Sequence, residues 1–393
     1  MTAGRAPLRI CIVAPPSLRI PPFHGYGGSQ RGIYDLCHVL TERGHRVTLC
    51  GPGDSQAACA RLIAPLAQPL WEDDSPYPRA ERDALTERYA RDVAAALADE
   101  PCDVVNVRFD HHGLIAALVA QDRAPVLYSC HNPASERFIR VGVELAGRLY
   151  TNAHCRAHRD QYRAVPGMQV VPYGMDVAGY AYRPAPLSRW AAPPTVPALR
   201  RLWEQGRDYL AWVGRIAPAK GTRAAIAIAR AAGLPLVIAG APENRHHPTV
   251  AYYEQEIRPA IDEQEVFALG VADEAVKQEL LGGAVATLFT TGLEQATWAE
   301  PFGRVIMESL ACGTPLVAHA HGSAPEILTP EVAALGGSVE ELAAGVAAVR
   351  GLDRARCRLY AEHTFARDRM GAGYEALYRA IIAHRARSGG APA

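Results

Sequence analysis

The sequence of 393 residues lacks an excess of either charge, a long apolar run and a paired cysteine motif. Lysine and arginine together number 41, as do aspartate and glutamate. Proteins that bind nucleic acid normally carry a basic excess or a basic block, so the charge balance predicts no nucleic-acid partner. The nine cysteines are odd in number and scattered singly, and Cys11, Cys50 and Cys130 lie within apolar runs. This pattern predicts reduced, buried thiols in a cytoplasmic protein.

Membrane and secretion signals are also missing from the sequence. No apolar stretch approaches the roughly 18 residues that a membrane span needs. The first residues carry one short apolar strand where a signal peptide would have an apolar core and a cleavage site. Residues 136–163 hold six arginines against three acids, which predicts at most weak contact with a membrane surface. With 49% hydrophobic residues and roughly 150 residues per domain, we expect two to three globular domains.

Strand and helix patterns alternate along the chain. Residues 8–14 and 45–51 are short apolar runs rich in β-branched side chains, and residues 30–43 between them place apolar side chains at helical spacing. The alternation is interrupted by a Pro-rich segment, 178–208, and then restarts. Short apolar strands that alternate with helices indicate parallel sheets with both faces buried. The sequence therefore predicts an α/β fold of two doubly wound, Rossmann-like domains, closed by an amphipathic helix over 366–386.

Ligands bind such sheets outside the carboxyl ends of the strands. We therefore look for candidate site residues in the loops that follow the strands. The first of these loops ends in Gly25-Tyr26-Gly27-Gly28, directly before a helix. Glycines there expose backbone N–H groups to a ligand, and the helix dipole favours an anion. Gln30 replaces the third glycine of a dinucleotide-binding motif, which disfavours a nicotinamide-dependent dehydrogenase. A plain turn into a helix remains the alternative for this loop.

Two charged segments in the second half of the chain are further candidates. Arg215 and Lys220 lie in the loop GRIAPAKG, between a strand and a helix, where phosphate oxygens would find cations. In the segment EPFGRVIMESLACGTP, Glu300 precedes a helix and Glu308 follows two turns later. A carboxylate can accept hydrogen bonds from two vicinal hydroxyls of a sugar or a ribose. Glu308 borders a small, apolar run that indicates burial, so we expect it to have a polar partner.

Together, these segments resemble a known family. The sequences EPFGRVIMESLACGTPLVA, GRIAPAKG and VVPYGMDVAGY are similar to motifs of the retaining glycosyltransferases of family 4, which have the GT-B fold. The glycine loop, His131 in LYSCHNP and the order of the elements fit as well, over residues 8 to 385. The resemblance implies two domains that face each other across a cleft, with the C-terminal helix returning to the N-terminal domain. Residues 1–185 plus 366–393 would bind the acceptor, and residues 186–365 the nucleotide sugar.

The resemblance also implies roles for individual residues. Arg215 and Lys220 would hold the diphosphate of the donor, Glu308 the ribose hydroxyls and Glu300 the hydroxyls of the sugar. His131 would contact a sugar hydroxyl near the anomeric carbon, unless it is a structural histidine at a strand end. The remaining donor contacts would come from backbone groups of Gly27, Gly28, Val271, Phe302, Gly303 and Arg304.

The expected reaction is transfer of a hexose-type sugar to an acceptor hydroxyl with retention, without a cofactor and without a metal. The GYGGSQ loop is similar to members that glycosylate antibiotics, which points to secondary metabolism and to a natural-product or small-glycan acceptor. A nucleotide-sugar epimerase of the same fold and a non-catalytic nucleotide-sugar-binding protein are the alternatives. Tyr173 replaces an asparagine that is usual in the family. The sequence gives no indication of an oligomeric state.

Overall fold

The structure is a computed structural model that describes residues 6–22, 27–71, 75–242 and 248–388. The described chain forms two compact units, of which the first combines residues up to Gly174 with those from Arg367 onward. The second unit spans Met175–Ala366. The sequence predicted domain boundaries at 185/186 and 365/366. In the structure, the first boundary between the units lies earlier, before Met175. Met175 pairs with Ala366 of the same unit in a parallel bridge.

The first unit contains a seven-stranded parallel sheet in the order β3-β2-β1-β4-β5-β6-β7. The strands are β1 (Arg9–Val13), β2 (Arg46–Cys50), β3 (Arg61–Ile63), β4 (Val104–Val107), β5 (Val126–Ser129), β6 (Leu149–Ala153) and β7 (Gln169–Val170). The helices are α1 (Gly28–Glu42), α2 (Arg82–Asp99), α3 (His112–Gln121), α4 (Glu136–Glu144), α5 (Arg156–Gln161) and α14 (Arg367–Arg387). The order of strands confirms the predicted doubly wound topology.

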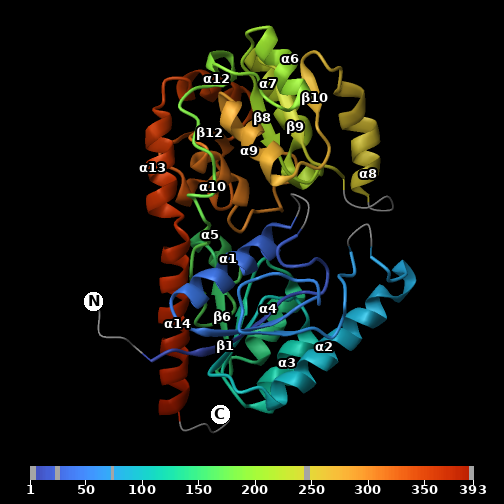
Figure 1. Ribbon diagram of the computed structural model, residues 1–393, viewed down its shortest axis with the longest axis vertical. Helices are drawn as coiled ribbons and strands as arrows, with labels where there is room; N and C mark the ends of the chain where they lie inside the picture. The colour runs from blue at the N-terminus through green and yellow to red at the C-terminus, as the bar shows by residue number, and fades with distance from the viewer. Residues whose placement is uncertain (1–5, 23–26, 72–74, 243–247, 389–393) are drawn as a thin grey trace. The chain divides into compact units, whose positions relative to one another are not determined.

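Both faces of this sheet are covered, as the continuous apolar strands predicted. Ile10 and Ile12 of β1 point into a core shared with α1 and α14, which contact each other (Figure 1). Cys11 and Val13 point into the opposite core, which α2 and α3 complete. The alternation follows from the two-residue period of a strand.

Helix α14 confirms the predicted helix over 366–386 and belongs to the first unit. Its Glu375 accepts hydrogen bonds from Arg43, which directly follows α1, and from Arg379 one turn later in α14. Partial burial opposes ionisation of Glu375, but these two guanidinium groups outweigh that effect and lower the pKa of the carboxyl to about 2. The ion pair with Arg43 therefore helps to hold α14 against the end of α1.

The second unit contains a six-stranded parallel sheet in the order β10-β9-β8-β11-β12-β13. The strands are β8 (Leu210–Val213), β9 (Leu236–Ala239), β10 (Val266–Ala268), β11 (Ala286–Phe289), β12 (Leu316–His319) and β13 (Ala333–Gly336). The helices are α6 (Pro197–Glu204), α7 (Thr222–Ala232), α8 (Thr249–Tyr252), α9 (Glu274–Gly283), α10 (Arg304–Ala311), α11 (Ala324–Ile327), α12 (Val339–Val349) and α13 (Arg354–Thr364). Helices α7 and α12 pack together over one face, and α10 contacts both α9 and α13.

Two segments of the second unit differ from the prediction. The helix expected over 249–264 is only the short α8, followed by a π turn at 253–257 and a 3-10 turn at 258–260. Pro259 explains the ending, because proline lacks the N–H that would continue the helix. The Pro-rich segment contains α6, which begins with Pro197 at its first position, where a missing N–H costs little.

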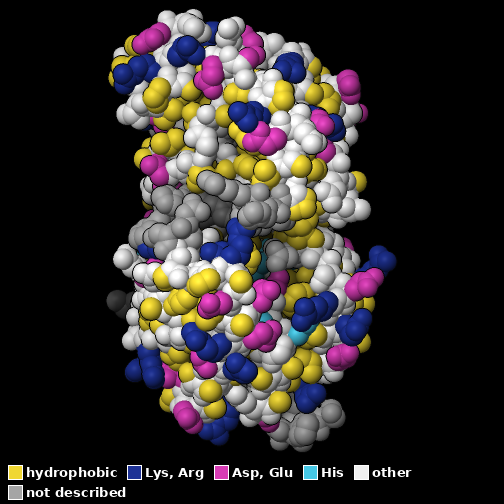
Figure 2. Space-filling view, turned by 90° about the vertical axis from the view of Figure 1, so that its right-hand side faces the viewer, with side chains coloured by type: hydrophobic (Ala, Val, Ile, Leu, Met, Phe, Trp, Pro, Cys, Tyr) yellow, Lys and Arg dark blue, Asp and Glu magenta, His cyan; other side chains and the backbone are white. Residues whose placement is uncertain are grey.

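The surface carries mixed charges. On the face shown in Figure 2, Lys and Arg side chains alternate with Asp and Glu side chains, without a broad patch of one sign. Among the described residues, no helix is both long and apolar enough to cross a membrane.

Candidate active site

The loop between β8 and α7 carries Arg215 and Lys220 at the carboxyl edge of the second sheet. Thr290, directly after β11, fixes this loop, because its hydroxyl donates to the Lys220 carbonyl over 2.9 Å. Gly221 has a φ of 70°, and a Cβ at this position would lie 2.3 Å from the Thr290 carbonyl oxygen. Only glycine fits at this position. Gly221 therefore permits the close approach between Thr290 and the Lys220 loop, at the start of α7.

Arg215, Lys220 and Glu300 come together, as the sequence predicted. The carboxylate of Glu300 forms an ion pair with the ammonium group of Lys220. The indole ring of Trp298 lies beside both cations, with its centre 5.9 Å from Cζ of Arg215 and 5.7 Å from Nζ of Lys220. These distances are typical of cation–π contacts. Two cations, one carboxylate and one aromatic face thus form a single cluster.

The backbone of Glu300 is fixed by the loop that follows β12. The Ser323 N–H donates to the Glu300 carbonyl over 3.2 Å, and the Ser323 hydroxyl donates to the Phe302 carbonyl over 2.7 Å. A Cβ at Gly322 would lie 2.8 Å from the Glu300 nitrogen, so a glycine permits this close approach. The phenyl ring of Phe302 is buried and packs edge-on against Phe365. Phe302 therefore presents its backbone, and not its ring, to the site.

Helix α10 begins beside this cluster. Gly303 precedes it with a φ of 89°, a conformation that favours glycine. Gly303 has no side chain that could cap the helix. Such a helix start attracts an anion through its first N–H groups and through the helix dipole. The predicted contribution of Gly303 and Arg304 through backbone N–H groups is compatible with this geometry.

Glu308 lies two turns further along α10 and is only 3% exposed. Its carboxylate accepts hydrogen bonds from Lys277 over 2.8 Å, from Arg304 over 3.1 Å and from the Tyr180 hydroxyl over 3.3 Å. Burial raises the pKa of Tyr180, and the neighbouring Glu308 and Glu274 raise it further. The expected polar partner of Glu308 is therefore present, and it consists of two cations and a hydroxyl.

Lys277 is a site residue that the sequence reasoning missed. It is 3% exposed and lies between Glu308 and Glu274, with a distance of 3.1 Å to the latter. A signal was present in the sequence, because Lys277 shares a helical face with the buried Leu280 and Leu281. A lysine on an apolar helix face needs a buried acid as its partner.

The predicted base-binding segment follows β10. Val271 is 51% exposed and follows Gly270, which has a φ of 66°. The Gly270 carbonyl accepts a hydrogen bond from the Gly240 N–H over 2.7 Å, which ties this turn to the end of β9. Val271 thus lies at the same edge of the sheet as the loops of Lys220 and Glu300, because all six strands are parallel.

The predicted residues of the first unit lie at the matching edge of its own sheet. Gly27 and Gly28 start helix α1, and Gly27 has a φ of 112° without a side-chain cap on the helix. Gly25 and Tyr26 of the same loop lie outside the described residues. His131 follows β5, and its Nδ1 contacts the Tyr173 hydroxyl. The contacts of Gly27 and Gly28 with the nucleotide-sugar donor, and of His131 with its sugar, stay a prediction.

His154 and His158 have a spacing that occurs in metal sites, but one ring nitrogen of each contacts a backbone carbonyl oxygen. His154 precedes α5 and contacts the Val171 carbonyl oxygen through Nδ1 over 3.1 Å. His158 contacts the Asn132 carbonyl oxygen through Nε2 over 2.9 Å. Among the residues that the structure describes, no group of three or more His, Cys, Asp or Glu side chains could hold a metal ion.

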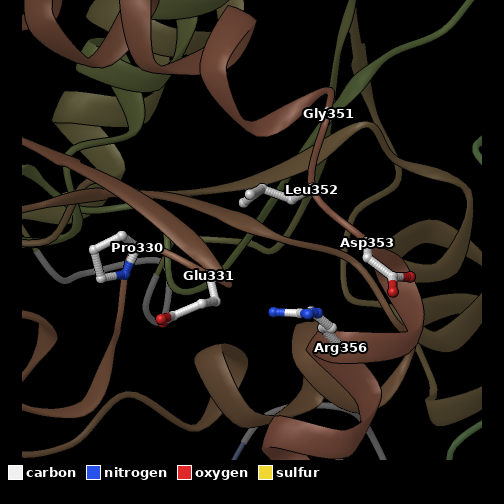
Figure 3. Close-up of a pocket in the computed structure, with 6 residues that line it drawn as sticks. All are labelled: Pro330, Glu331, Gly351, Leu352, Asp353 and Arg356. Atoms are coloured by element: carbon white, nitrogen blue, oxygen red, sulfur yellow. The ribbon is translucent and has the colours of Figure 1, made fainter.

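One hollow of about 410 Å³ lies elsewhere in the second unit (Figure 3). Its lining residues are Pro330, Glu331, Gly351, Leu352, Asp353 and Arg356. None of the predicted site residues is among them, so this hollow is separate from the cluster around Glu300.

Comparison with known proteins gives the two halves of the chain separate family matches. Residues 26–178 match the model of Glycosyltransferase Family 4, and residues 200–361 match that of Glycosyl transferases group 1. The sequence has no significant match among the curated proteins compared with it.

Solved structures with the same fold include several glycosyltransferases. AviGT4, a glycosyltransferase involved in avilamycin A biosynthesis, is 23% identical with a TM-score of 0.68, over 96% of this chain and 99% of that one. Anabaena HepE in complex with UDP and glucose is 19% identical with a TM-score of 0.68, over 94% and 99% of the two chains. Sucrose-phosphate synthase of Thermosynechococcus elongatus is 18% identical with a TM-score of 0.72, over 96% and 100%. The predicted GT-B fold is confirmed by these neighbours.

Proposed function

Because the chain belongs to glycosyltransferase family 4, with a group 1 glycosyl transferase domain, we propose that this glycosyltransferase works with retention of configuration. The donor would be a nucleotide-diphosphate sugar of the hexose type, and the acceptor would be a hydroxyl of a natural product or a small glycan. The avilamycin-related AviGT4 and the UDP-bound HepE suggest which acceptors and nucleotides to test first.

The observation that carries this proposal is the cluster of Arg215, Lys220 and Glu300 beside the start of α10. Departure of the nucleotide diphosphate leaves negative charge on its phosphate oxygens. Two cations and the N–H groups of a helix start can stabilise that charge without a metal. Glu300 would hold hydroxyls of the sugar, and Glu308 the two ribose hydroxyls.

The chemical step follows from the same charges. The bond between the anomeric carbon and the phosphate oxygen breaks, and its electron pair leaves with the nucleotide diphosphate. The acceptor oxygen attacks from the face that the leaving group vacates and forms the new bond. Its proton passes to the departing phosphate oxygen. No pair of carboxylates in the arrangement of a glycoside hydrolase is needed for this course.

Replacement of Glu308 by alanine should weaken nucleotide binding by about 10- to 100-fold, because two ribose hydroxyls lose a charged acceptor. Isothermal titration with UDP, GDP and TDP would measure the change and identify the base. Glu308→Gln is the matched control for packing, since it retains the shape and loses the charge. Unchanged affinity in Glu308→Ala would contradict the role of Glu308.

Incubation with a panel of nucleotide sugars separates transfer from its alternatives. A transferase releases nucleotide at a high rate only when an acceptor is present. An epimerase changes the sugar of the donor without any acceptor, and a binding protein leaves the donor intact. Acceptor-independent change of the donor sugar would therefore contradict the proposed reaction.

A further inference from the structure

The loop between β11 and α10 is fastened to the start of α7. The Gly292 N–H donates to the Ala219 carbonyl over 2.9 Å. Two residues further on, Glu294 accepts a hydrogen bond from the Ala224 N–H of α7 over 2.8 Å. The Glu294 side chain is only 7% exposed, so this contact is buried. The segment that leads to Trp298 is thus held against α7.

These contacts also occupy the start of α7. The Tyr252 hydroxyl accepts a hydrogen bond from the Arg223 N–H over 2.9 Å and donates one to Glu294 over 2.9 Å. The N–H groups of Arg223 and Ala224, in the first turn of α7, therefore have acceptors within the protein. A helix start whose N–H groups are already bonded attracts an anion less. An anion at the loop between β8 and α7 is then attracted chiefly by the cations beside Glu300.

Trp298 contacts both of these cations. The centre of its indole ring lies 5.9 Å from Cζ of Arg215 and 5.7 Å from Nζ of Lys220. The indole N–H is buried and has no hydrogen-bond partner among the described residues, so the ring contributes through its π face. Two like charges beside one ring repel each other. The negative face of the indole attracts both and offsets part of that repulsion.

We propose that Trp298 is a positioning residue that holds Arg215 and Lys220 in place for the two phosphates of the donor. The inference rests on the proposed function, in which these cations bind the diphosphate. Long cationic side chains lose rotamer freedom when they bind an anion, and a contact that restricts them beforehand reduces this cost. Trp298 therefore strengthens the binding of a diphosphate and leaves the binding of an uncharged nucleoside unchanged.

Isothermal titration of the full-length protein with sodium pyrophosphate, UDP and uridine tests the proposal. Trp298→Leu removes the aromatic face and should weaken the binding of pyrophosphate and of UDP by about 5- to 30-fold, the size expected for the loss of one or two cation–π contacts. The affinity for uridine should change by less than about twofold, because uridine carries no charge for the cations to attract. Circular dichroism checks that the variant is folded, and Trp298→Met takes its place if it is not.

Trp298→Phe and Trp190→Leu are the matched controls. Trp298→Phe keeps an aromatic face, so its affinity for pyrophosphate should stay within about threefold of wild type. Trp190 also stacks with a cation, since its ring centre lies 4.5 Å from Cζ of Arg183. It lies next to Gly283, which precedes β11 at the amino edge of the sheet. Trp190→Leu should therefore leave the affinity for pyrophosphate unchanged.

The possible outcomes separate this inference from the proposed function. Equal affinity of Trp298→Leu and wild type for pyrophosphate would overturn the inference. Equal losses for pyrophosphate and uridine would overturn it as well, because they would indicate general disruption of the site. A wild-type protein that binds neither pyrophosphate nor UDP would remove both the inference and the proposed donor. A wild-type protein that shows the expected dependence on Trp298 but transfers no sugar would remove the proposed function alone.

Discussion

Replacement of Lys220 by methionine should lower kcat/KM for the donor by about 100- to 1,000-fold, the usual cost of removing one preorganised charge donor. Lys220 lies beside Arg215 and pairs with Glu300, and Thr290 fixes its backbone. Methionine keeps the length and the apolar stem, so the lost ammonium charge causes the change. Steady-state kinetics of nucleotide release with an acceptor would measure it.

The control for this variant is Arg230→Met. Arg230 is an exposed residue of α7, the helix that Lys220 precedes. Its replacement removes the same unit of charge at the surface, where screening by salt makes the effect small. We expect activity within about twofold of wild type. A loss of less than about tenfold in Lys220→Met would contradict its role in stabilising the leaving group.

Arg354→Met should lower the free energy of unfolding of the second unit by about 3–5 kcal/mol, because several buried acceptors lose their donor at a cost of about 1–3 kcal/mol each. Arg354 is 8% exposed and donates to three backbone carbonyls and one hydroxyl at 2.5–2.8 Å. The acceptors belong to Arg183, Gly282, Ala284 and Thr314. Without the guanidinium group they remain buried and lose these bonds.

Urea denaturation followed by tryptophan fluorescence would measure this loss of stability. Arg356→Met is the matched control, because Arg356 is an exposed residue of the same helix and lines the hollow in Figure 3. It should change stability by less than about 0.5 kcal/mol. A loss below about 1 kcal/mol in Arg354→Met would show that water replaces the guanidinium bonds.

The fold could be predicted from the sequence where its periodicity is strong. Strand β1 and helix α1 show clear apolar patterns, and the same alternation predicted most of both sheets. Strand β13 and helix α12 were missed, because the Ala-rich run over 333–349 has little contrast between apolar and polar positions. Helix α6 was hidden by the prolines around it.

The site residues could be predicted where they lie in local sequence motifs, and were missed where only the fold makes them neighbours. Lys220 and Glu300 lie in motifs with a recognisable spacing, and the structure brings them together. Lys277 was missed, because its partner Glu308 is distant in the sequence. Tyr173 and Arg108 could not be grouped with His131, since only the order of strands β4 to β7 makes them neighbours.

The central claim is that this glycosyltransferase retains the configuration of the transferred sugar. The most direct test is the proton spectrum of the purified product formed from an α-linked donor such as UDP-glucose. The coupling constant of the anomeric proton distinguishes the two linkages. An α-linked product is the result that we predict. A β-linked product would contradict attack from the face that the leaving group vacates, and with it the proposed mechanism.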